Sequence, residues 1–316
     1  MESKMSENPK ILSHPPPGDE DLHVDFQYYM FDWDDNILHM PTKIYLERKT
    51  KERWEDFPVA TSTFAQIRSD TENYRPRNGD WDDAFVEFYD VGRRGEEAFI
   101  EDTKTALAPV IEGRETGGPS FRRFHKALIE GRLFAIITAR AHASENIRRG
   151  VEYFIENILT QGERDHMVKN LRRYNRFFGE EDGHMTDEEV IAKYLDLNRY
   201  RGVTSPEFRE LVGQDIDSGA ESPTRAKQFA IREFVQHVIA LVGDRAGDAP
   251  VSVGFSDDDA NNVAAVQEFI EQELASEYPD VKFVIYDTSD PSVPRGKKIV
   301  ITGQLELDLD HMPDDA

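Results

Sequence analysis

The sequence contains no cysteine, and its basic side chains are far outnumbered by acidic ones. The absence of cysteine excludes disulfide scaffolds, thiolate zinc sites, iron–sulfur clusters and cysteine nucleophiles. With 38 Lys and Arg against 62 Asp and Glu, the formal net charge is −24, and such a surface repels a nucleic-acid backbone. A general nucleic-acid binder is therefore not expected, although a local basic pocket can still admit a small anionic substrate.

Long apolar runs are also missing. No run approaches the ~20 residues that a membrane-spanning helix needs. Residues 1–17 have no apolar core behind a basic start, so we expect no signal peptide and a cytoplasmic protein without membrane association. Hydrophobic residues still make up 38% of the chain, which is enough for a folded core. Outside that core we expect a flexible N-terminal arm, 1–23, and an acidic tail, 304–316.

Short apolar runs alternate along the chain with segments of helical pattern. We predict strands over 26–31, 133–137, 251–255, 282–286 and, as an edge strand, 298–302. We predict helices over 121–130, 145–159, 222–241 and 261–274. Ser120 and Ser144 are expected to cap the first two helices. The alternation predicts an α/β fold, a Rossmann-like parallel sheet with helices on both faces.

Two stretches do not follow the alternation and are interpreted as insertions over the edge of the sheet. Residues 43–117 begin with a predicted β-hairpin and continue with helices near 82–91 and 94–111. Residues 146–215 are mostly helical and polar, with Thr186 as the cap of one helix. Which of the two insertions forms the larger lid stays open at this point.

Three of the predicted strands end in side chains that can carry chemistry. In chain order these side chains are Asp32 and Asp34, then Thr138, then Asp257 and Asp258. Ligands of an open parallel sheet bind at the carboxyl ends of its strands, so these groups are expected to meet. Carboxylates gathered at one point repel each other and need a cation, and oxygen-only ligands favour Mg²⁺.

Four segments resemble the sequence motifs of the haloacid dehalogenase (HAD) superfamily, in that family's order. They are residues 31–38 (FDWDDNIL), residues 136–140 (IITAR), Lys227 near the start of a predicted helix, and residues 254–259 (GFSDDD). The resemblance implies a HAD core made of residues 24–42, 118–145 and 216–303, roughly half of the chain. The remaining segments would then be mainly helical cap insertions.

The resemblance also implies roles in phosphate-ester hydrolysis. Asp32 would be the nucleophile that forms an aspartyl-phosphate, and Asp34 would protonate the leaving group and then activate water. Thr138 would hydrogen-bond the transferring phosphoryl group, while Lys227 would neutralise its charge and orient Asp32. The ligands of Mg²⁺ would be Asp32, the backbone carbonyl of Asp34, Asp257 and Asp258.

The expected activity is Mg²⁺-dependent hydrolysis of a phosphoric monoester. A substantial cap closes over such a site and excludes solvent, which favours a small phosphorylated metabolite as substrate. The presence of Asp34 favours phosphate chemistry, because members of the family that cleave carbon–halogen bonds lack this second aspartate. Asn36 replaces the usual Thr or Val of the first motif, but its amide can still hydrogen-bond the loop.

The sequence leaves open which aspartate of the fourth motif binds the metal. Ser256 stands where glycine is common before the metal-binding aspartate, so Asp257, Asp258 and Asp259 all compete for the role. The same aspartates can instead form an acidic cap for the helix that follows.

Several residues near the motifs have competing interpretations. Arg225 is a rival to Lys227 in the third motif. Arg140 and His142 follow the second strand and are candidates for substrate contact, with a surface turn as the alternative. Residues 40–42 lie where a cap would hinge, or form only a turn.

A basic and aromatic stripe over residues 164–178 leaves a second function open. Such a stripe can bind nucleic acid by charge and stacking, which would suit a nucleic-acid end phosphatase. We favour a solvated face of an amphipathic helix, whose charge Glu180, Glu181 and Asp182 offset. A third function is a non-catalytic binding protein with the same fold, and the complete set of motif residues argues against it.

Overall fold

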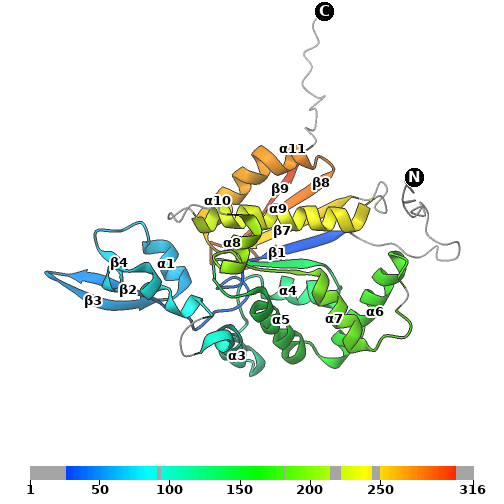
Figure 1. Ribbon diagram of the computed structural model, residues 1–316, viewed down its shortest axis with the longest axis horizontal. Coiled ribbons are helices and arrows are strands. Elements are labelled where there is room, and N and C mark those ends of the chain that lie inside the picture. The colour runs from blue at the N-terminus through cyan, green and yellow to red at the C-terminus, as the bar shows by residue number, and fades with distance from the viewer. Residues whose placement is uncertain (1–25, 91–93, 181, 214–221, 244–249, 304–316) are drawn as a thin grey trace, which may run out of the picture.

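The computed structural model describes residues 26–90, 94–180, 182–213, 222–243 and 250–303. The expected N-terminal arm and acidic tail lie outside these residues. The described chain forms a six-stranded sheet with helices on both faces and a second, three-stranded sheet at one end (Figure 1). Among the described helices, none is long and apolar enough to cross a membrane.

The larger sheet has the strand order β6-β5-β1-β7-β8-β9. The bounds are β1 Gln27–Phe31, β5 Phe134–Thr138, β6 Arg199–Gly202, β7 Val251–Asp257, β8 Val281–Asp287 and β9 Lys297–Thr302. The first five strands of this order run parallel, and β9 pairs antiparallel with β8 at the edge. The predicted α/β class and parallel sheet are confirmed, and five strands lie where the apolar runs placed them.

Strand β6 was not predicted, because it contains a single large apolar residue between two arginines. Its register pairs Tyr200 with Ile136 of β5, and Tyr200 is buried. The segment 146–215, interpreted as an insertion, therefore contributes one strand to the main sheet. The glycine that ends β6 is required by close packing, since a Cβ at Gly202 would lie 2.3 Å from the carbonyl oxygen of His142.

Two layers of helices bury the two faces of the sheet. One layer holds α9 (Ser222–Val242) and α10 (Ala260–Phe269), which continues through a π-turn into α11 (Ala275–Glu277). The other holds α3 (Ala98–Ile111), α4 (Phe121–Ile129), α5 (Ser144–Ile158), α6 (Gln161–Phe177) and α7 (Asp187–Leu197). Alternate residues of β1 serve the two cores, since Met30 faces the first layer and Phe31 the second.

The predicted caps were right for one helix and wrong for two. Thr186 caps α7 with a complete capping box. Ser120 is the N-cap residue of α4 but its side chain makes no capping hydrogen bond, because its hydroxyl lies 2.6 Å from that of Ser256. Ser144 is the first residue of α5, and its hydroxyl donates to the carbonyl of Tyr200 at 2.7 Å. Both serine hydroxyls instead contact residues far away in the sequence, and a local sequence pattern does not reveal such contacts.

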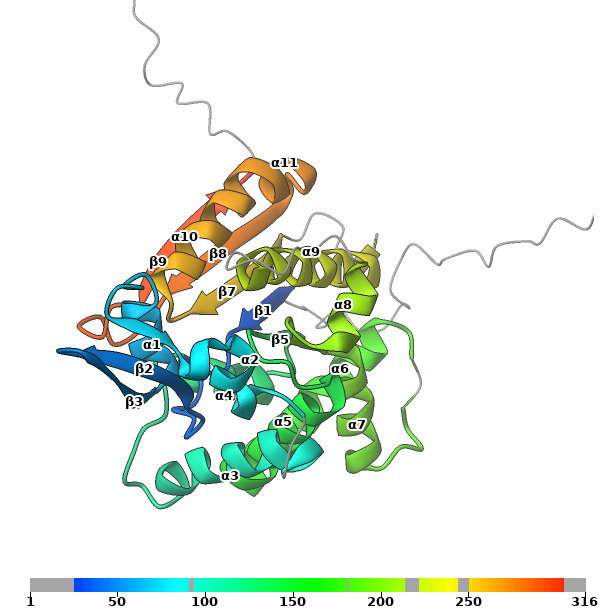
Figure 2. The same ribbon diagram turned by 60° about the vertical axis from the view of Figure 1, so that its left-hand side comes forward.

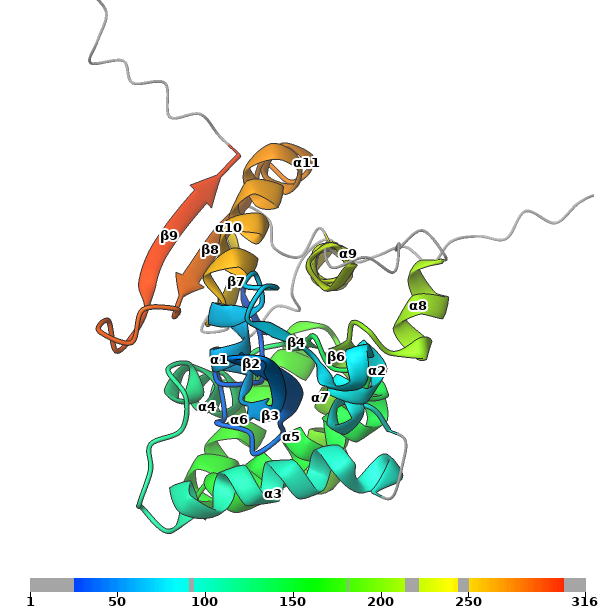
Figure 3. The same ribbon diagram turned by 90° about the vertical axis from the view of Figure 1, so that its left-hand side faces the viewer.

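Residues 44–88 form a small subdomain at the carboxyl ends of the main strands (Figures 2 and 3). Its elements are β2 (Ile44–Thr50), β3 (Arg53–Val59), α1 (Thr61–Ile67), β4 (Tyr74–Pro76), a 3₁₀ turn (Arg77–Gly79), α2 (Trp81–Ala84) and a second 3₁₀ turn (Val86–Phe88). The hairpin is confirmed, whereas the helix expected over 82–91 is reduced to short turns. The helix expected over 94–111 is α3, preceded by a 3₁₀ turn (Gly95–Glu97), and α3 packs on α5 in the main body.

Helix α8 (Pro206–Val212) follows β6, and a hydrogen bond joins it to the start of α5. Its N-terminal cap is Ser205, whose hydroxyl accepts the backbone N–H of Phe208 at 3.1 Å. Glu207 in its first turn accepts the backbone N–H of Ser144, which joins the N-terminal ends of the two helices.

Candidate active site

Three aspartates from neighbouring strands meet at the carboxyl edge of the sheet. Asp32 directly follows β1, Asp257 ends β7 and Asp258 comes next, and oxygens of the three carboxylates lie within 4.8 Å of one another. They meet because β1 and β7 are adjacent parallel strands, with Phe31 opposite Ser256. Asp32 and Asp257 are buried, and Asp258 is half-buried.

The ammonium group of Lys227 bridges two of these carboxylates. Its Nζ lies 2.7 Å from Asp32 Oδ1 and 2.7 Å from Asp257 Oδ2. Burial alone would lower its pKa, but the two carboxylates raise the pKa of Lys227 well above the usual value for lysine, so the group is charged. Lys227 is 2% exposed and comes from α9, whereas its rival Arg225 is exposed on the same helix.

One lysine does not neutralise three clustered carboxylates. Burial raises the pKa of Asp32 well above its ordinary value, and Asp257 and Asp34 add to the rise while Lys227 opposes it. Burial and the neighbouring Asp257 and Asp32 likewise raise the pKa of Asp258. A cation among these oxygens would offset the repulsion, and an all-carboxylate donor set suits a hard divalent ion such as Mg²⁺. The residues present therefore fit a magnesium ion.

Asp259 does not join the cluster. Its Oδ1 accepts the backbone N–H of Asn261 at 2.9 Å and thereby caps α10. Its Oδ2 lies 3.0 Å from Nη2 of Arg68, which belongs to the small subdomain. Of the three aspartates that competed in the fourth motif, Asp257 and Asp258 face Asp32, and Asp259 has the capping role.

Asp34 lies two residues from Asp32, but its carboxylate has a separate set of partners. Oδ2 accepts a hydrogen bond from Thr138 Oγ1 at 3.1 Å. The Arg140 guanidinium donates from Nε to Oδ2 at 2.8 Å and from Nη2 to Oδ1 at 2.5 Å. The backbone carbonyl of Asp34, the predicted metal ligand, accepts the N–H of Asn36 at 2.6 Å. The four predicted catalytic residues thus form two adjoining groups: Asp32 with Lys227, and Asp34 with Thr138.

Arg140 and His142 fit neither alternative that the sequence left open, substrate contact or a surface turn. Both side chains are 0% exposed. His142 Nδ1 lies 2.6 Å from Asp90 Oδ1, and its Nε2 lies 3.4 Å from Nη1 of Arg140. Burial lowers the pKa of His142, although Asp90 offsets part of this effect. A neutral ring with its proton on Nδ1 satisfies both contacts.

Asn36 joins the carboxyl ends of three strands, β1, β7 and β8. Its Nδ2 donates to the carbonyls of Asp32 at 3.1 Å and Ser256 at 3.0 Å. Its Oδ1 accepts from the hydroxyls of Thr288 at 2.9 Å and Ser256 at 3.3 Å. The side chain is fully buried, and its amide is satisfied on both ends. The expectation that this amide would hydrogen-bond the loop is confirmed.

Helix α1 of the small subdomain is attached on two sides of the aspartate cluster. Asp35 Oδ2 accepts from Thr61 Oγ1 at 2.6 Å and from the backbone N–H of Ser62 at 3.0 Å. Burial opposes the effect, but these hydrogen bonds and one from His39 lower the pKa of Asp35. Seven residues after Thr61, Arg68 forms the ion pair with Asp259. The helix therefore bridges the loops after β1 and β7.

The basic and aromatic stripe lies on and just after α6, and its aromatic rings are not free for stacking. Tyr174, Phe177 and Phe178 pack against the core beneath α9. On the polar face, Arg172 Nη2 lies 2.9 Å from Asp187 Oδ1. These contacts support the amphipathic-helix interpretation over a nucleic-acid surface.

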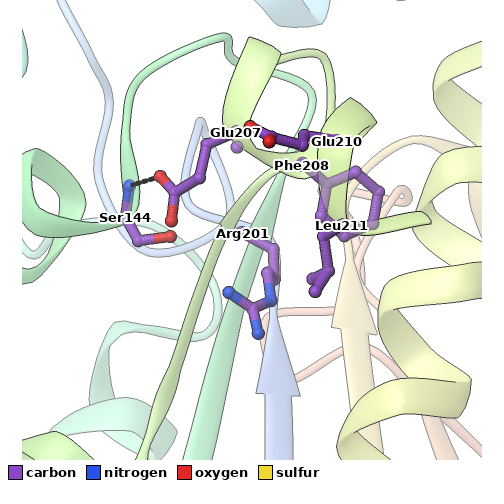
Figure 4. A pocket seen from close by; sticks show the side chains of 7 residues that line it. Ser144, Arg201, Glu207, Phe208, Glu210 and Leu211 are labelled. Carbon is purple, nitrogen blue, oxygen red and sulfur yellow. Dashed lines mark hydrogen bonds between the residues drawn. The ribbon is translucent and has the colours of Figure 1, made fainter. Parts of the chain in front are cut away.

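Two shallow pockets lie along β6, away from the aspartate cluster. The lining of the one in Figure 4, of about 260 Å³, consists of Ser144, Arg201, Gly202, Glu207, Phe208, Glu210 and Leu211. Its Glu207 accepts the N–H of Ser144 at 2.9 Å, and Arg201 donates to Glu233 at 2.8 Å. Arg201 is therefore already paired with an acidic residue and Glu207 holds a backbone N–H, so the aspartate cluster remains the stronger candidate site.

In comparisons with known proteins, no family model, no curated protein and no solved structure matches the chain. The function is therefore inferred from the side chains of the site and their geometry.

Proposed function

We propose that the protein is a Mg²⁺-dependent phosphoric monoester hydrolase with a HAD-like core, and that Asp32 is its nucleophile. The observation that carries the proposal is the position of Lys227, whose buried Nζ lies 2.7 Å from both Asp32 and Asp257. A structural ion pair needs one carboxylate per lysine, whereas here one lysine contacts two carboxylates and a third lies beside them. Buried groups with perturbed pKa values in such an arrangement are typical of catalytic sites.

The proposed reaction proceeds in two steps. A carboxylate oxygen of Asp32 attacks the phosphorus, the bond to the leaving oxygen breaks, and an aspartyl-phosphate forms. Water then attacks this phosphorus, releasing inorganic phosphate and restoring the carboxylate. Lys227 binds Asp32 Oδ1 and thereby fixes the direction in which Oδ2 points. Its positive charge also stabilises the negative charge of the phosphoryl group. Bound Mg²⁺ would supply further charge neutralisation at the phosphoryl oxygens.

Asp34 is proposed to handle the protons of both steps. In its protonated form it donates a proton to the leaving oxygen, and as a carboxylate it then accepts one from the attacking water, which restores the protonated form. Its carboxylate is on the same loop as the nucleophile and is held by Thr138 at 3.1 Å. Thr138 therefore acts here on Asp34, which differs from the direct phosphoryl contact that the family resemblance implies.

A small phosphorylated metabolite is the proposed substrate class. The small subdomain serves as the cap, because α1 is attached to Asp35 on one side of the cluster and to Asp259 on the other. A cap fixed so close to the carboxylates limits the size of the leaving group and excludes water.

The test is Mg²⁺-dependent phosphate release from p-nitrophenyl phosphate and from a panel of sugar and nucleoside monophosphates. Asp32→Asn should reduce turnover by about 10³-fold or more, since the nucleophile is lost. Asp165→Asn, on the exposed face of α6, is the matched control and should keep wild-type activity. Wild-type protein without turnover on any member of the panel would contradict the proposal and favour a non-catalytic binding protein.

A further inference from the structure

We propose that Arg140 is a positioning residue that holds the carboxylate of Asp34 in its working orientation. The inference rests on the proposed function, because Asp34 is the proton donor and acceptor of that reaction. Arg140 does not touch the substrate, since its side chain is 0% exposed. Its effect would be transmitted through Asp34 alone.

The contact between Arg140 and Asp34 is a two-pronged pair. Nε lies 2.8 Å from Oδ2 and Nη2 lies 2.5 Å from Oδ1, so the planar guanidinium matches both carboxylate oxygens. Without it, the one other described side-chain hydrogen bond to this carboxylate comes from Thr138 Oγ1 at 3.1 Å. A single hydrogen bond permits rotation about the Cβ–Cγ bond, whereas the fork fixes the plane of the carboxylate.

The guanidinium is itself held from several directions. Nη2 donates to Thr42 Oγ1 at 2.6 Å, and that hydroxyl donates to Asp102 Oδ2 at 2.7 Å. The guanidinium carbon lies 4.7 Å from the centre of the Phe88 ring. Thr42 lies just before the small subdomain in the chain, and Phe88 is the last residue of that subdomain. These contacts connect the guanidinium that orients Asp34 to the base of the proposed cap.

The backbone that carries Arg140 is also tightly constrained. Its carbonyl oxygen would lie 2.9 Å from a Cβ at position 202, so only glycine allows β6 to approach this closely. The N–H of Ala141 donates to the carbonyl of Phe88 at 2.9 Å. A residue can hold its partner in one orientation only if its own backbone is fixed, and these contacts fix the backbone of Arg140.

The experiment compares Arg140→Lys with Arg201→Lys, a matched control. Arg201 makes the same kind of fork to Glu233, at 2.9 and 2.8 Å, on the neighbouring strand. Steady-state constants are measured with p-nitrophenyl phosphate and with phenyl phosphate, whose leaving group depends more on protonation. Arg140→Lys should lower kcat about 10²-fold with KM within threefold, and the loss should be larger for phenyl phosphate. Arg201→Lys should leave both constants within about twofold.

Three results would overturn the positioning role. They are an unchanged kcat in folded Arg140→Lys, a change confined to KM, and equal losses on the two substrates, because a purely structural role does not depend on the leaving group. If Arg140→Lys does not fold, Thr42→Val removes one anchor of the guanidinium and should show the same leaving-group dependence with a smaller loss.

Failure of the proposed function gives a different pattern. In that case Asp32→Asn and wild type both lack Mg²⁺-dependent turnover. The positioning role is then decided by a crystal structure of Arg140→Lys. A rotated Asp34 carboxylate would support it, and an Asp34 carboxylate that stays on Thr138 in the same plane would overturn it.

Discussion

At the residue scale, the side chain of Asn36 contributes more to the stability of the site than its position in a loop suggests. Its amide bonds the loops after β1 and β8 and the end of β7. We predict that Asn36→Ala lowers the free energy of unfolding by about 3 kcal/mol, because buried carbonyl and hydroxyl groups lose their partners. Urea denaturation measures the change. The control is Asn157→Ala, whose amide bonds Tyr153 on the surface of α5 and should cost little; similar losses for both variants would contradict the prediction.

A second prediction at this scale separates two adjacent aspartates. Asp258→Asn should weaken Mg²⁺ binding at least about tenfold, because it removes an anionic oxygen from the cluster. Asp259→Asn should leave Mg²⁺ binding unchanged, since Asp259 caps α10 and asparagine caps equally well. Isothermal titration calorimetry with MgCl₂ compares the two variants. Equal affinities would show that the cation binds elsewhere.

The sequence predicted the aspartates and the lysine of the site but not the network behind them. Asp32 and Asp257 were readable because each follows a buried apolar strand, and Lys227 because it lies near the start of a helix. The burial of Arg140 was not readable, since a charged residue after a strand is ordinarily exposed. Its partner Thr42 comes from a distant loop, and no local pattern links Thr42 to Asp102.

At the element scale, α7 depends on its N-terminal capping box. Thr186 Oγ1 accepts the N–H of Glu189, and the Glu189 side chain accepts the N–H of Thr186. Thr186→Ala should lower the free energy of unfolding by about 1 kcal/mol. Thr105→Ala on α3 is the control, because that hydroxyl donates only to Glu101 one turn earlier on an exposed face. Chemical denaturation in which both variants lose equally would argue against a capping contribution.

Strand β6 is attached to α9 by charge, which makes its stability depend on pH. Burial opposes the effect, but Arg201 and Arg199 lower the pKa of Glu233. The ionised Glu233 thus stabilises the folded state above its unfolded pKa, and this contribution is lost as pH falls through the lowered folded pKa. Glu233→Gln should cost about 1 kcal/mol at pH 7 and progressively less below pH ~4.5.

Urea midpoints of wild type and Glu233→Gln between pH 3.5 and 7 measure this difference. His237 faces the same arginines, and burial lowers its pKa while Glu233 opposes that effect. A gap between the two proteins that widens on acidification would have the wrong sign for the prediction.

The elements themselves were predictable where the pattern was strong. β1, β5 and β7 are apolar runs that end in polar residues, and the structure has strands there. β6 lacks such a run, because an edge strand in this sheet needs little more than Tyr200 facing the core. The helix expected near residue 82 failed because Ala84 and Phe88 pack into the small subdomain through tight turns.

At the scale of the whole molecule, the net charge of −24 works against compactness. Raising NaCl from 0.01 to 0.1 M shortens the screening length from about 30 to about 10 Å. We therefore predict a higher urea midpoint at the higher salt concentration. Choline chloride at the same ionic strength should give the same rise if screening is the cause. A lower midpoint would mean that surface ion pairs outweigh the repulsion.

The central place of β1 in the sheet has a consequence for how the protein is made. Tyr29 pairs with Phe134 on one side and with Gly254 on the other. During synthesis β1 leaves the ribosome first, yet its second neighbour is among the last strands to emerge, so its hydrogen bonds are completed late. Asp32 and Asp257 extend from this same pair of strands. The late pairing of β1 with β7 is thus also the step that brings the candidate nucleophile to its lysine and its fellow carboxylates.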